Sequence, residues 1–343
     1  MFLKTARRTI REARRAAAVR RAASAVKLAP VRPVNPLGPT DVPLIVPVRN
    51  ERSRLPPFLA HYRQLGVTRF LIVDDRSRDG TLEYLADQPD VDLHLSDVRF
   101  ADAAHGIQWR YALARRYGFN RHYLSVDIDE YLVYSGMEAH GLADLFAWMA
   151  RNRWSRLLAP MIDLYPPDPT ANAAFSSERA PWKVATHFDR TGYDLSMKSI
   201  GPLISGGAME RLFRIPHFIQ KFPVLYWTPR TVHYPNIHNP FPYQLSQPRV
   251  LGCLLHFKLF ADLEERARAA IIDKQYVGEA YKYRSYVDRL AAGSITTPSC
   301  AESIRYTGPG QFVELGLMEK IDWPDGCSVV NNTADGQHAE SRP

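Results

Sequence analysis

The chain has 343 residues, of which 45% are hydrophobic and 23% are charged, and its formal net charge is +8. These values argue against a disordered chain and predict a globular protein with one large or two small domains. Cys253, Cys300 and Cys327 form no C-x-x-C pair, which argues against a zinc ribbon or a disulfide framework and favours a reducing compartment. No apolar run reaches about 18 residues and no secretory signal is recognised, so we expect a cytoplasmic protein.

The excess positive charge lies at the N-terminus. Residues 1–27 hold nine Lys and Arg against one acid, Glu12, whereas the rest of the chain holds 35 basic and 35 acidic residues. The segment has the pattern of a helix whose apolar positions are mostly alanine. A solvated or disordered arm, a peripheral membrane contact through residues 1–28, and a nucleic-acid or transit-type role are the alternatives. A Pro-rich linker, Pro30–Pro43, follows.

From residue 44 onward, apolar strands alternate with helices. Strands are predicted at Leu44–Val48, Arg69–Val73, Asp92–Leu95 and His122–Val126, and helices at Leu55–Leu65, Thr81–Ala86 and Gly106–Tyr117. Helices of this length between strands indicate βαβ units. We therefore expect an α/β fold with a mainly parallel central sheet flanked by helices. In such sheets ligands bind beyond the carboxyl ends of the strands, where the polar clusters of this chain lie.

Beyond residue 135 the pattern is less regular. Predicted elements are a helix at Leu142–Arg151, strands at Arg156–Ile162, Met209–Ile215, Val224–Trp227 and Leu251–Phe257, and a helical pair within Asp262–Arg289. The stretch Tyr165–Pro248 is rich in Pro, Gly and aromatic residues, which is typical of a variable half that shapes a substrate site.

Asp127 and Asp129 follow the fourth strand. Alternation along a strand puts both carboxylates on one face, where they can hold a divalent cation and, through it, a diphosphate. A strand that runs into a polar turn is the alternative. His256 lies in a distant apolar run and is either a core histidine or a third ligand that suits Mn²⁺. Lys258, on the same predicted strand face, is placed to neutralise a departing diphosphate.

Polar residues also follow the first two strands. Asp74 and Asp75 begin a turn, and a carboxylate there can accept the imide N–H of a base such as uracil. A turn with a helix cap is the alternative, although it leaves the adjacent acids unexplained. Arg49, Asn50 and Glu51 are candidates for contacts to base and ribose, with a solvated loop as the alternative.

The third predicted helix starts close to these strand ends. Gln108 and Arg110 lie near its N-terminus, where free N–H groups and the helix dipole favour a phosphate. A surface salt bridge explains Arg110 equally well.

As an ordered set, these motifs resemble family 2 glycosyltransferases, which have the nucleotide-diphospho-sugar transferase (GT-A) fold. The matching segments are Pro47–Glu51, Val73–Thr81 and Asp127–Tyr131. The chain is more narrowly similar to the "family 2-like" branch, in which a helix with Gln and an aromatic residue precedes D-x-D-E-[FY] and an L-x-H-[FY] motif follows late. Gln108–Tyr111 and Leu254–Lys258 match these two features.

The resemblance implies a role for each matched residue. Pro47, Arg49, Glu51 and one of Asp74 or Asp75 would contact the nucleoside. Asp127 and Asp129 would bind ribose and a Mn²⁺ or Mg²⁺ ion through the diphosphate, with His256 as third ligand. Transfer would proceed with inversion, a carboxylate taking the proton of the acceptor hydroxyl. The family's Glu-Asp dyad has no clear counterpart; Glu210, Asp163 and Asp194 are the candidate bases.

Five segments follow from this interpretation. They are a basic arm and Pro-rich linker (1–42), a nucleotide-sugar-binding half (43–135), an acceptor-shaping half (136–262), a C-terminal helical extension (263–324) and a disordered tail (325–343). We expect a metal-dependent glycosyltransferase, cytoplasmic or peripheral to the inner face of the membrane, acting on a glycan or lipid-linked acceptor. The alternative is a catalytically silent nucleotide-sugar- or membrane-binding module. A neutral body without a basic aromatic groove argues against a nucleic-acid partner, and the missing glycine-rich first turn argues against a methyltransferase.

Overall fold

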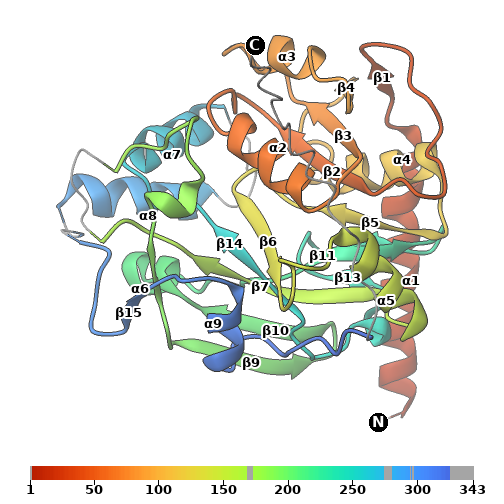
Figure 1. Cartoon of the computed structure of the whole chain (residues 1–343). Coiled ribbons are helices and arrows are strands. Elements are labelled where there is room, and N and C mark those ends of the chain that lie inside the picture. The colour runs from red at the N-terminus through yellow and green to blue at the C-terminus, as the bar shows by residue number, and fades with distance from the viewer. Residues whose placement is uncertain (1, 168–172, 274–279, 294, 296, 325–343) are drawn as a thin grey trace, which may run out of the picture.

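A computed structural model describes residues 2–167, 173–273, 280–293, 295 and 297–324. Over these residues the chain is an α/β protein built on one large mixed sheet (Figure 1). Within the described residues, the nine strands of that sheet are, in spatial order, β1 (Leu28–Pro30), β4 (Val91–Ser96), β3 (Arg69–Asp74), β2 (Pro43–Val48), β5 (Arg121–Ser125), β11 (Gln220–Trp227), β7 (Arg156–Asp163), β14 (Gly252–His256) and β6 (Glu130–Tyr134).

The expected α/β class is confirmed, but the expected mainly parallel sheet is wrong. Parallel pairing joins β4, β3, β2 and β5 in one block and β7 to β14 in another. The other pairs of the sheet are antiparallel, because β11 runs against both β5 and β7, and β6 runs against β14. Helical crossovers are confined to the first block, where the sequence alternates regularly. In the second half a helix lies between β6 and β7 and another precedes β11, but loops and hairpins make the other connections, which permit antiparallel neighbours.

Helices cover the sheet, and three short two-stranded sheets extend it. The helices are α1 (Phe2–Ala25), α2 (Leu55–Gln64), α3 (Thr81–Ala86), α4 (Ile107–Tyr117), α5 (Leu142–Arg151), α6 (Ala208–Phe213), α7 (Leu263–Ile272), α8 (Ala280–Ala291) and α9 (Pro309–Glu314). The short sheets pair β9 (Tyr193–Lys198) with β10 (Gly201–Gly206), β12 (Val232–His233) with β13 (Pro240–Phe241), and β8 (His187–Asp189) with β15 (Ser303–Arg305). None of the helices in the described ranges combines the length and apolar composition needed to cross a bilayer.

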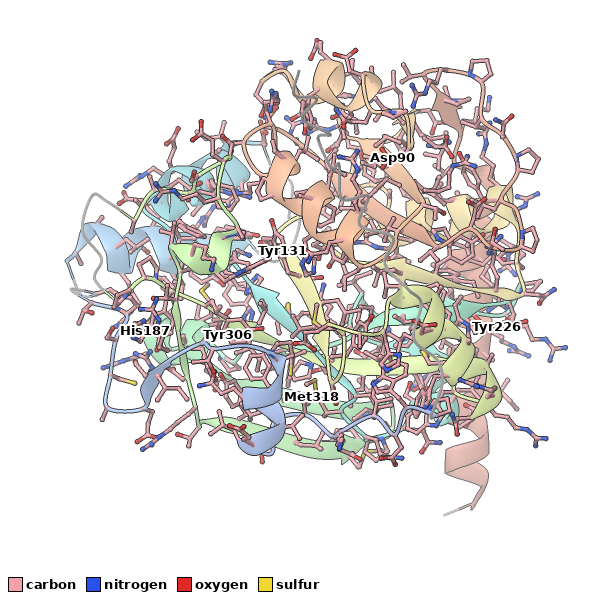
Figure 2. The ribbon with its side chains drawn as sticks, in the orientation of Figure 1. Asp90, Tyr131, His187, Tyr226, Tyr306 and Met318 are labelled. Atoms are coloured by element: carbon pink, nitrogen blue, oxygen red, sulfur yellow. The ribbon has the colours of Figure 1, made fainter. Side chains whose placement is uncertain are left out.

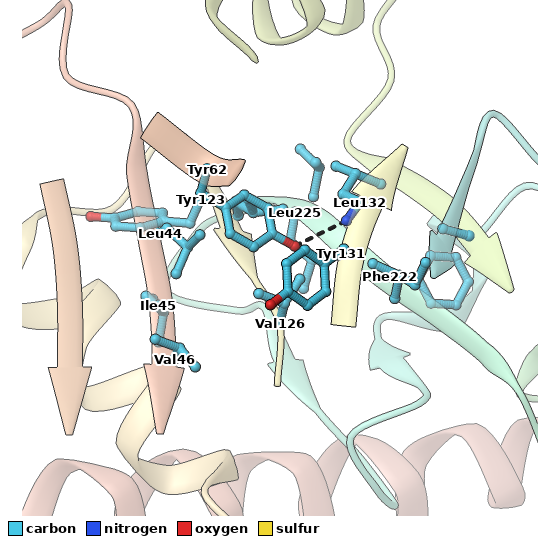
Figure 3. Close-up of a cluster of buried hydrophobic side chains, with 14 of the residues drawn as sticks. Leu44, Ile45, Val46, Tyr62, Tyr123, Val126, Tyr131, Leu132, Phe222 and Leu225 are labelled. Atoms are coloured by element: carbon cyan, nitrogen blue, oxygen red, sulfur yellow. Dashed lines mark hydrogen bonds between the residues drawn. The ribbon is translucent and has the colours of Figure 1, made fainter. Parts of the chain in front are cut away.

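Aromatic packing holds β6 beneath α2. The hydroxyl of Tyr62 on α2 accepts a hydrogen bond from the Leu132 N–H of β6 at 3.0 Å and donates one to the carbonyl oxygen of Glu130 at 2.8 Å (Figure 3). Tyr131 lies in the interior of the molecule, its ring edge-on to Phe257 (Figure 2). Because Tyr131 follows the D-x-D-E segment directly, this packing fixes the backbone that carries the acids.

Two segments differ from their predicted form. Met209–Ile215, predicted as a strand, instead contains most of the helix α6. Its buried residues Met209, Leu212 and Phe213 have helical spacing, which places them on one side of a helix, and not the alternate spacing of a strand. The predicted linker begins within β1, an edge strand, and the basic arm is the helix α1, which packs against α4 rather than standing free in solvent. The tail 325–343, with Cys327, lies outside the described residues.

Candidate functional site

The acid pair after β3 lies at the carboxyl end of the parallel block. Asp74 Oδ1 accepts the Ser77 N–H at 3.0 Å, while Asp74 Oδ2 is buried without a hydrogen-bond partner. Burial raises the pKa of Asp74 above its usual range. Asp75 is paired instead, its Oδ1 lying 3.1 Å from Nε of Arg99. Asp74 therefore offers this strand end an unsatisfied oxygen, which a ligand N–H would match.

The polar residues after β2 are held by α7. Three contacts between a carboxyl group and an arginine side chain join the two segments, and we call them the α7 clasp: Arg49 to Asp273 at 2.7 Å, Glu51 to Arg266 at 2.9 Å, and Arg54 to Asp262 at 2.7 Å. Burial raises the pKa of Glu51 to about 8, against the lowering effect of Arg54. The nearby Asp129 also raises it, which puts Glu51 within electrostatic reach of the D-x-D segment. The clasp therefore closes the strand end where a nucleoside was predicted.

The two remaining residues predicted on this loop have different positions. Pro47 is half-buried within β2. Asn50 is exposed; its N–H donates to Ser77 Oγ and its Oδ1 accepts the Arg78 N–H, both at 2.8 Å. Asn50 thus joins the loops after β2 and β3.

Asp127 is surrounded by cations. Its Oδ1 lies 2.5 Å from Nη2 of Arg110 and its Oδ2 2.9 Å from Nζ of Lys221. Lys221 also lies 2.9 Å from Oε1 of Glu130. Burial alone would raise the pKa of Asp127, but Lys221 and Arg110 lower it well below its usual range. Likewise burial would lower the pKa of Lys221, but Asp127 and Glu130 raise it. Both groups are therefore charged at neutral pH.

Arg110 keeps one donor unused. It extends from α4, its Nε donates to Ser125 Oγ at 3.0 Å, and its buried Nη1 has no hydrogen-bond partner. Gly106, with φ of 75°, precedes α4, and a Cβ there would lie 2.8 Å from that Nη1. The glycine is thus required both by the backbone and by the approach of Arg110. Gln108 is half-buried in the first turn of α4, two residues before Arg110. Its contact with a phosphate stays a prediction.

Two groups of charged side chains thus flank the D-x-D segment, and we call them the charged rows. The first contains Arg110, Asp127, Lys221 and Glu130, and the second contains Asp129, His256 and Asp163. His256 Nδ1 lies 2.7 Å from Asp163 Oδ1, and His256 Nε2 lies 3.6 Å from Asp129 Oδ2. Burial would lower the pKa of His256, but the two carboxylates raise it to about 9. Burial likewise opposes the ionisation of Asp129, yet His256 and then Lys258 lower its pKa to about 2. Lys258 lies beyond the end of β14, its Nζ 5.7 Å from the Tyr283 ring centroid.

The predicted metal ligands fit a divalent ion in part. A histidine that ligates through Nε2 usually donates Nδ1–H to a carboxylate, as His256 does to Asp163. Asp129 lies on the Nε2 side of His256. Because its two carboxylate neighbours raise the pKa of His256 to about 9, an ion shared with Asp129 would have to displace the Nε2 proton. Asp127 is not suited to share an ion, because cations face both of its oxygens. Across the described ranges, no group of three or more His, Cys, Asp or Glu is arranged as a metal site.

The three candidate bases have unlike surroundings. Asp163 is buried, and its second oxygen accepts the Met209 N–H at 2.9 Å, so it orients His256. Glu210 accepts the N–H groups of Gly206 and His217 through one oxygen. It borders a cavity of about 260 Å³ whose lining also includes Asp189 and Arg211. Asp194 is exposed on β9.

Sequence reasoning missed Lys221, Glu130 and His217. Lys221 is a single cation in the strand β11, nearly 100 residues from its partner Asp127, and no local pattern marks it. Glu130 was visible only as part of the D-x-D-E motif. His217 follows α6, and burial lowers its pKa to about 4, against the raising effect of Asp163. A neutral imidazole therefore lies in electrostatic contact with the second charged row.

Comparison with protein-family models and with curated protein sequences gave no match for this chain.

Proposed function

We propose that the protein is a glycosyltransferase that moves a sugar from a nucleotide-diphosphate donor to a hydroxyl acceptor. Among the described residues, eleven buried side-chain nitrogen and oxygen atoms have no hydrogen-bond partner, and two of them, Asp74 Oδ2 and Arg110 Nη1, carry the proposal. One is an acceptor suited to a base N–H and the other a donor suited to a phosphate oxygen. They come from β3 and α4, two elements at the strand ends where α/β sheets bind nucleotides.

The charged rows support binding of the diphosphate. Arg110, Lys221 and Lys258 supply positive charge around the D-x-D segment. Asp129 and His256 would hold Mn²⁺ or Mg²⁺, which when bound stabilises negative charge on the leaving nucleoside diphosphate. Asp163 orients His256 for that contact. The GT-A form of the fold belongs to the same proposal.

Inverting transfer also needs a base for the acceptor hydroxyl. Glu210 borders the cavity described above, and its second carboxylate oxygen can take a proton while the first accepts two backbone N–H groups. His217, unprotonated at neutral pH, is a further candidate beside it. We propose that this cavity receives part of a glycan or lipid-linked acceptor.

A silent binding module is the second candidate function. It is favoured by one observation: none of the three acids predicted as bases is a free carboxylate beside His256. Asp163 is buried against His256, Glu210 accepts two backbone N–H groups, and Asp194 is exposed on β9. Turnover separates the two functions, because a silent module would bind the donor and leave it intact.

Thermal stabilisation by nucleoside diphosphates and nucleotide sugars, with and without Mn²⁺, tests the proposal. A ligand at one hundred times its Kd stabilises a protein by about 2.7 kcal/mol, which is a measurable shift. Asp74→Asn and Asp129→Asn should weaken the response, whereas Asp90→Asn, which alters an exposed ion pair with Arg63, should not. If no nucleotide in the panel raises the melting temperature, the proposal is wrong. Release of free sugar or nucleotide then distinguishes the enzyme from the silent module.

A further inference from the structure

The helix α1 has two unlike faces. Ala16 and Ala23 are fully buried where the helix packs on α4, and the Arg115 side chain donates to the Ser24 carbonyl oxygen at 3.3 Å. The outward face carries exposed arginines at helical spacing, namely Arg11, Arg14, Arg15 and Arg21. The acid of this segment, Glu12, is half-buried rather than exposed among them. The outward face is therefore a stripe of one charge on a helix anchored to the body.

Exposed apolar side chains lie near this stripe. Ile10, four residues before Arg14 and so on the same face, is 54% exposed. Leu245 in the short helix η2 (Tyr243–Leu245) is 47% exposed, and Met197 near the β9–β10 turn is 57% exposed. Singly these side chains need no explanation, but apolar side chains beside a cationic helix are the combination with which interfacial helices bind a bilayer.

Contacts along the chain connect these three segments. The helix α1 packs against β12, whose partner strand β13 leads directly into η2. The Glu12 carboxylate of α1 also helps burial to raise the pKa of Tyr243 in η2. Ser246, which follows η2, lies 3.4 Å from the position a Cβ would take on Gly201, at the β9–β10 turn. The Asn239 amide also donates to the Ile200 carbonyl oxygen at 3.4 Å. In Figure 1 the N-terminal end of α1 and the β9–β10 hairpin lie along the same lower edge.

We propose that this edge is a docking face for an anionic phospholipid surface. The docking face consists of the outward arginines of α1 together with Ile10, Leu245 and Met197. The arginines are attracted to anionic headgroups, and the three apolar side chains insert beside them. A nucleic-acid partner would explain the arginines but leave the apolar side chains without a role. The proposal does not rest on glycosyl transfer, since it concerns residues outside the candidate site.

Cosedimentation of the full-length protein with vesicles tests the docking face. Vesicles of phosphatidylcholine alone are compared with vesicles in which phosphatidylglycerol replaces part of it. Because each basic residue near an anionic surface contributes about 1 kcal/mol, Arg14→Glu with Arg15→Glu should weaken binding by about tenfold or more. Added salt should weaken it in the same direction. The double variant Met197→Ser with Leu245→Ser should bind vesicles more weakly. The binding that remains should depend on salt more strongly than that of the native protein.

The matched control is Ile272→Ser, which removes another exposed apolar side chain, from the end of α7. It should leave vesicle binding unchanged, and the melting temperatures of all variants show whether they are folded. Equal binding to both kinds of vesicle would overturn the proposal, as would a charge reversal without effect. A DNA duplex that binds through Arg14 and Arg15 when vesicles do not would assign the stripe to nucleic acid instead.

Discussion

Replacement of Lys221 by methionine tests how the D-x-D segment is held. Lys221 is 8% exposed and lies 2.9 Å from both Asp127 and Glu130. Methionine keeps much of the volume but leaves two acids in a buried site with one fewer cation. Removing one partner of a buried ion pair costs about 3–5 kcal/mol, and we expect about 3 kcal/mol because Arg110 stays on Asp127. The melting temperature should fall on the order of 5 °C.

The same variant has an effect that a purely structural lysine would not have. Without Lys221, Asp127 loses one of the cations that face it, so Mn²⁺ should raise the melting temperature of Lys221→Met more than that of the native protein. Differential scanning calorimetry with and without Mn²⁺ measures both effects. Arg63→Met serves as control, because Arg63 and Asp90 form a partly exposed pair whose loss should cost less than about 1 kcal/mol. A Lys221→Met variant that is no less stable than this control would refute the argument.

Three other outcomes follow from the structure. The pKa of His256, about 9, exceeds its unfolded value of about 6.5. The stability that its carboxylate neighbours contribute is therefore complete below pH 6.5 and is lost as the pH rises through 9. In urea titrations at several pH values, His256→Gln should show a smaller decline in the free energy of unfolding over this range. Gly206→Ala should lower the free energy of unfolding by more than about 3 kcal/mol, because a Cβ there would lie 1.9 Å from the Gly192 carbonyl oxygen. Gly118→Ala, at a similar φ but with open space around it, should lower it by only about 1 kcal/mol. Equal losses of stability in the two variants would contradict the steric reasoning. Arg54→Met should lower the free energy of unfolding, measured by thermal unfolding, by about 3 kcal/mol, because Arg54 is buried between Glu51 and Asp262. A loss below about 1 kcal/mol would mean that these contacts contribute little to stability.

The first half of the fold is predictable because its signals are local. The strands and helices between residues 43 and 125 were located to within one or two residues. They alternate apolar runs with helices that have clear ends, and each strand is buried on both faces. Their carboxyl ends therefore also placed Asp74 and Asp127 near the candidate site. The order of strands in the second half was not predictable, because β11 enters between β5 and β7 through contacts that no local pattern encodes.

The sequence predicted only some members of the candidate site, and it did not predict which charged groups contact one another. The D-x-D pattern pointed to two equivalent carboxylates on one strand face. In the structure both lie in the link between β5 and β6, and they face different partners, Lys221 for Asp127 and His256 for Asp129. Asp163 was considered as a base, yet it contacts His256 because β7 and β14 are parallel neighbours. Such pairing depends on sheet order, which a one-dimensional pattern does not contain.

The α7 clasp also has a consequence for the order in which the chain matures. Arg49, Glu51 and Arg54 belong to the first block of the sheet, but their partners lie more than 200 residues later, between Asp262 and Asp273. During synthesis from the N-terminus, the block that contains β2 and β3 leaves the ribosome long before those partners. Until then these three charged side chains remain exposed to solvent and to other proteins. The strand ends that carry the candidate site are therefore completed late in translation, and chains halted before α7 should be open to proteases at the loop after β2.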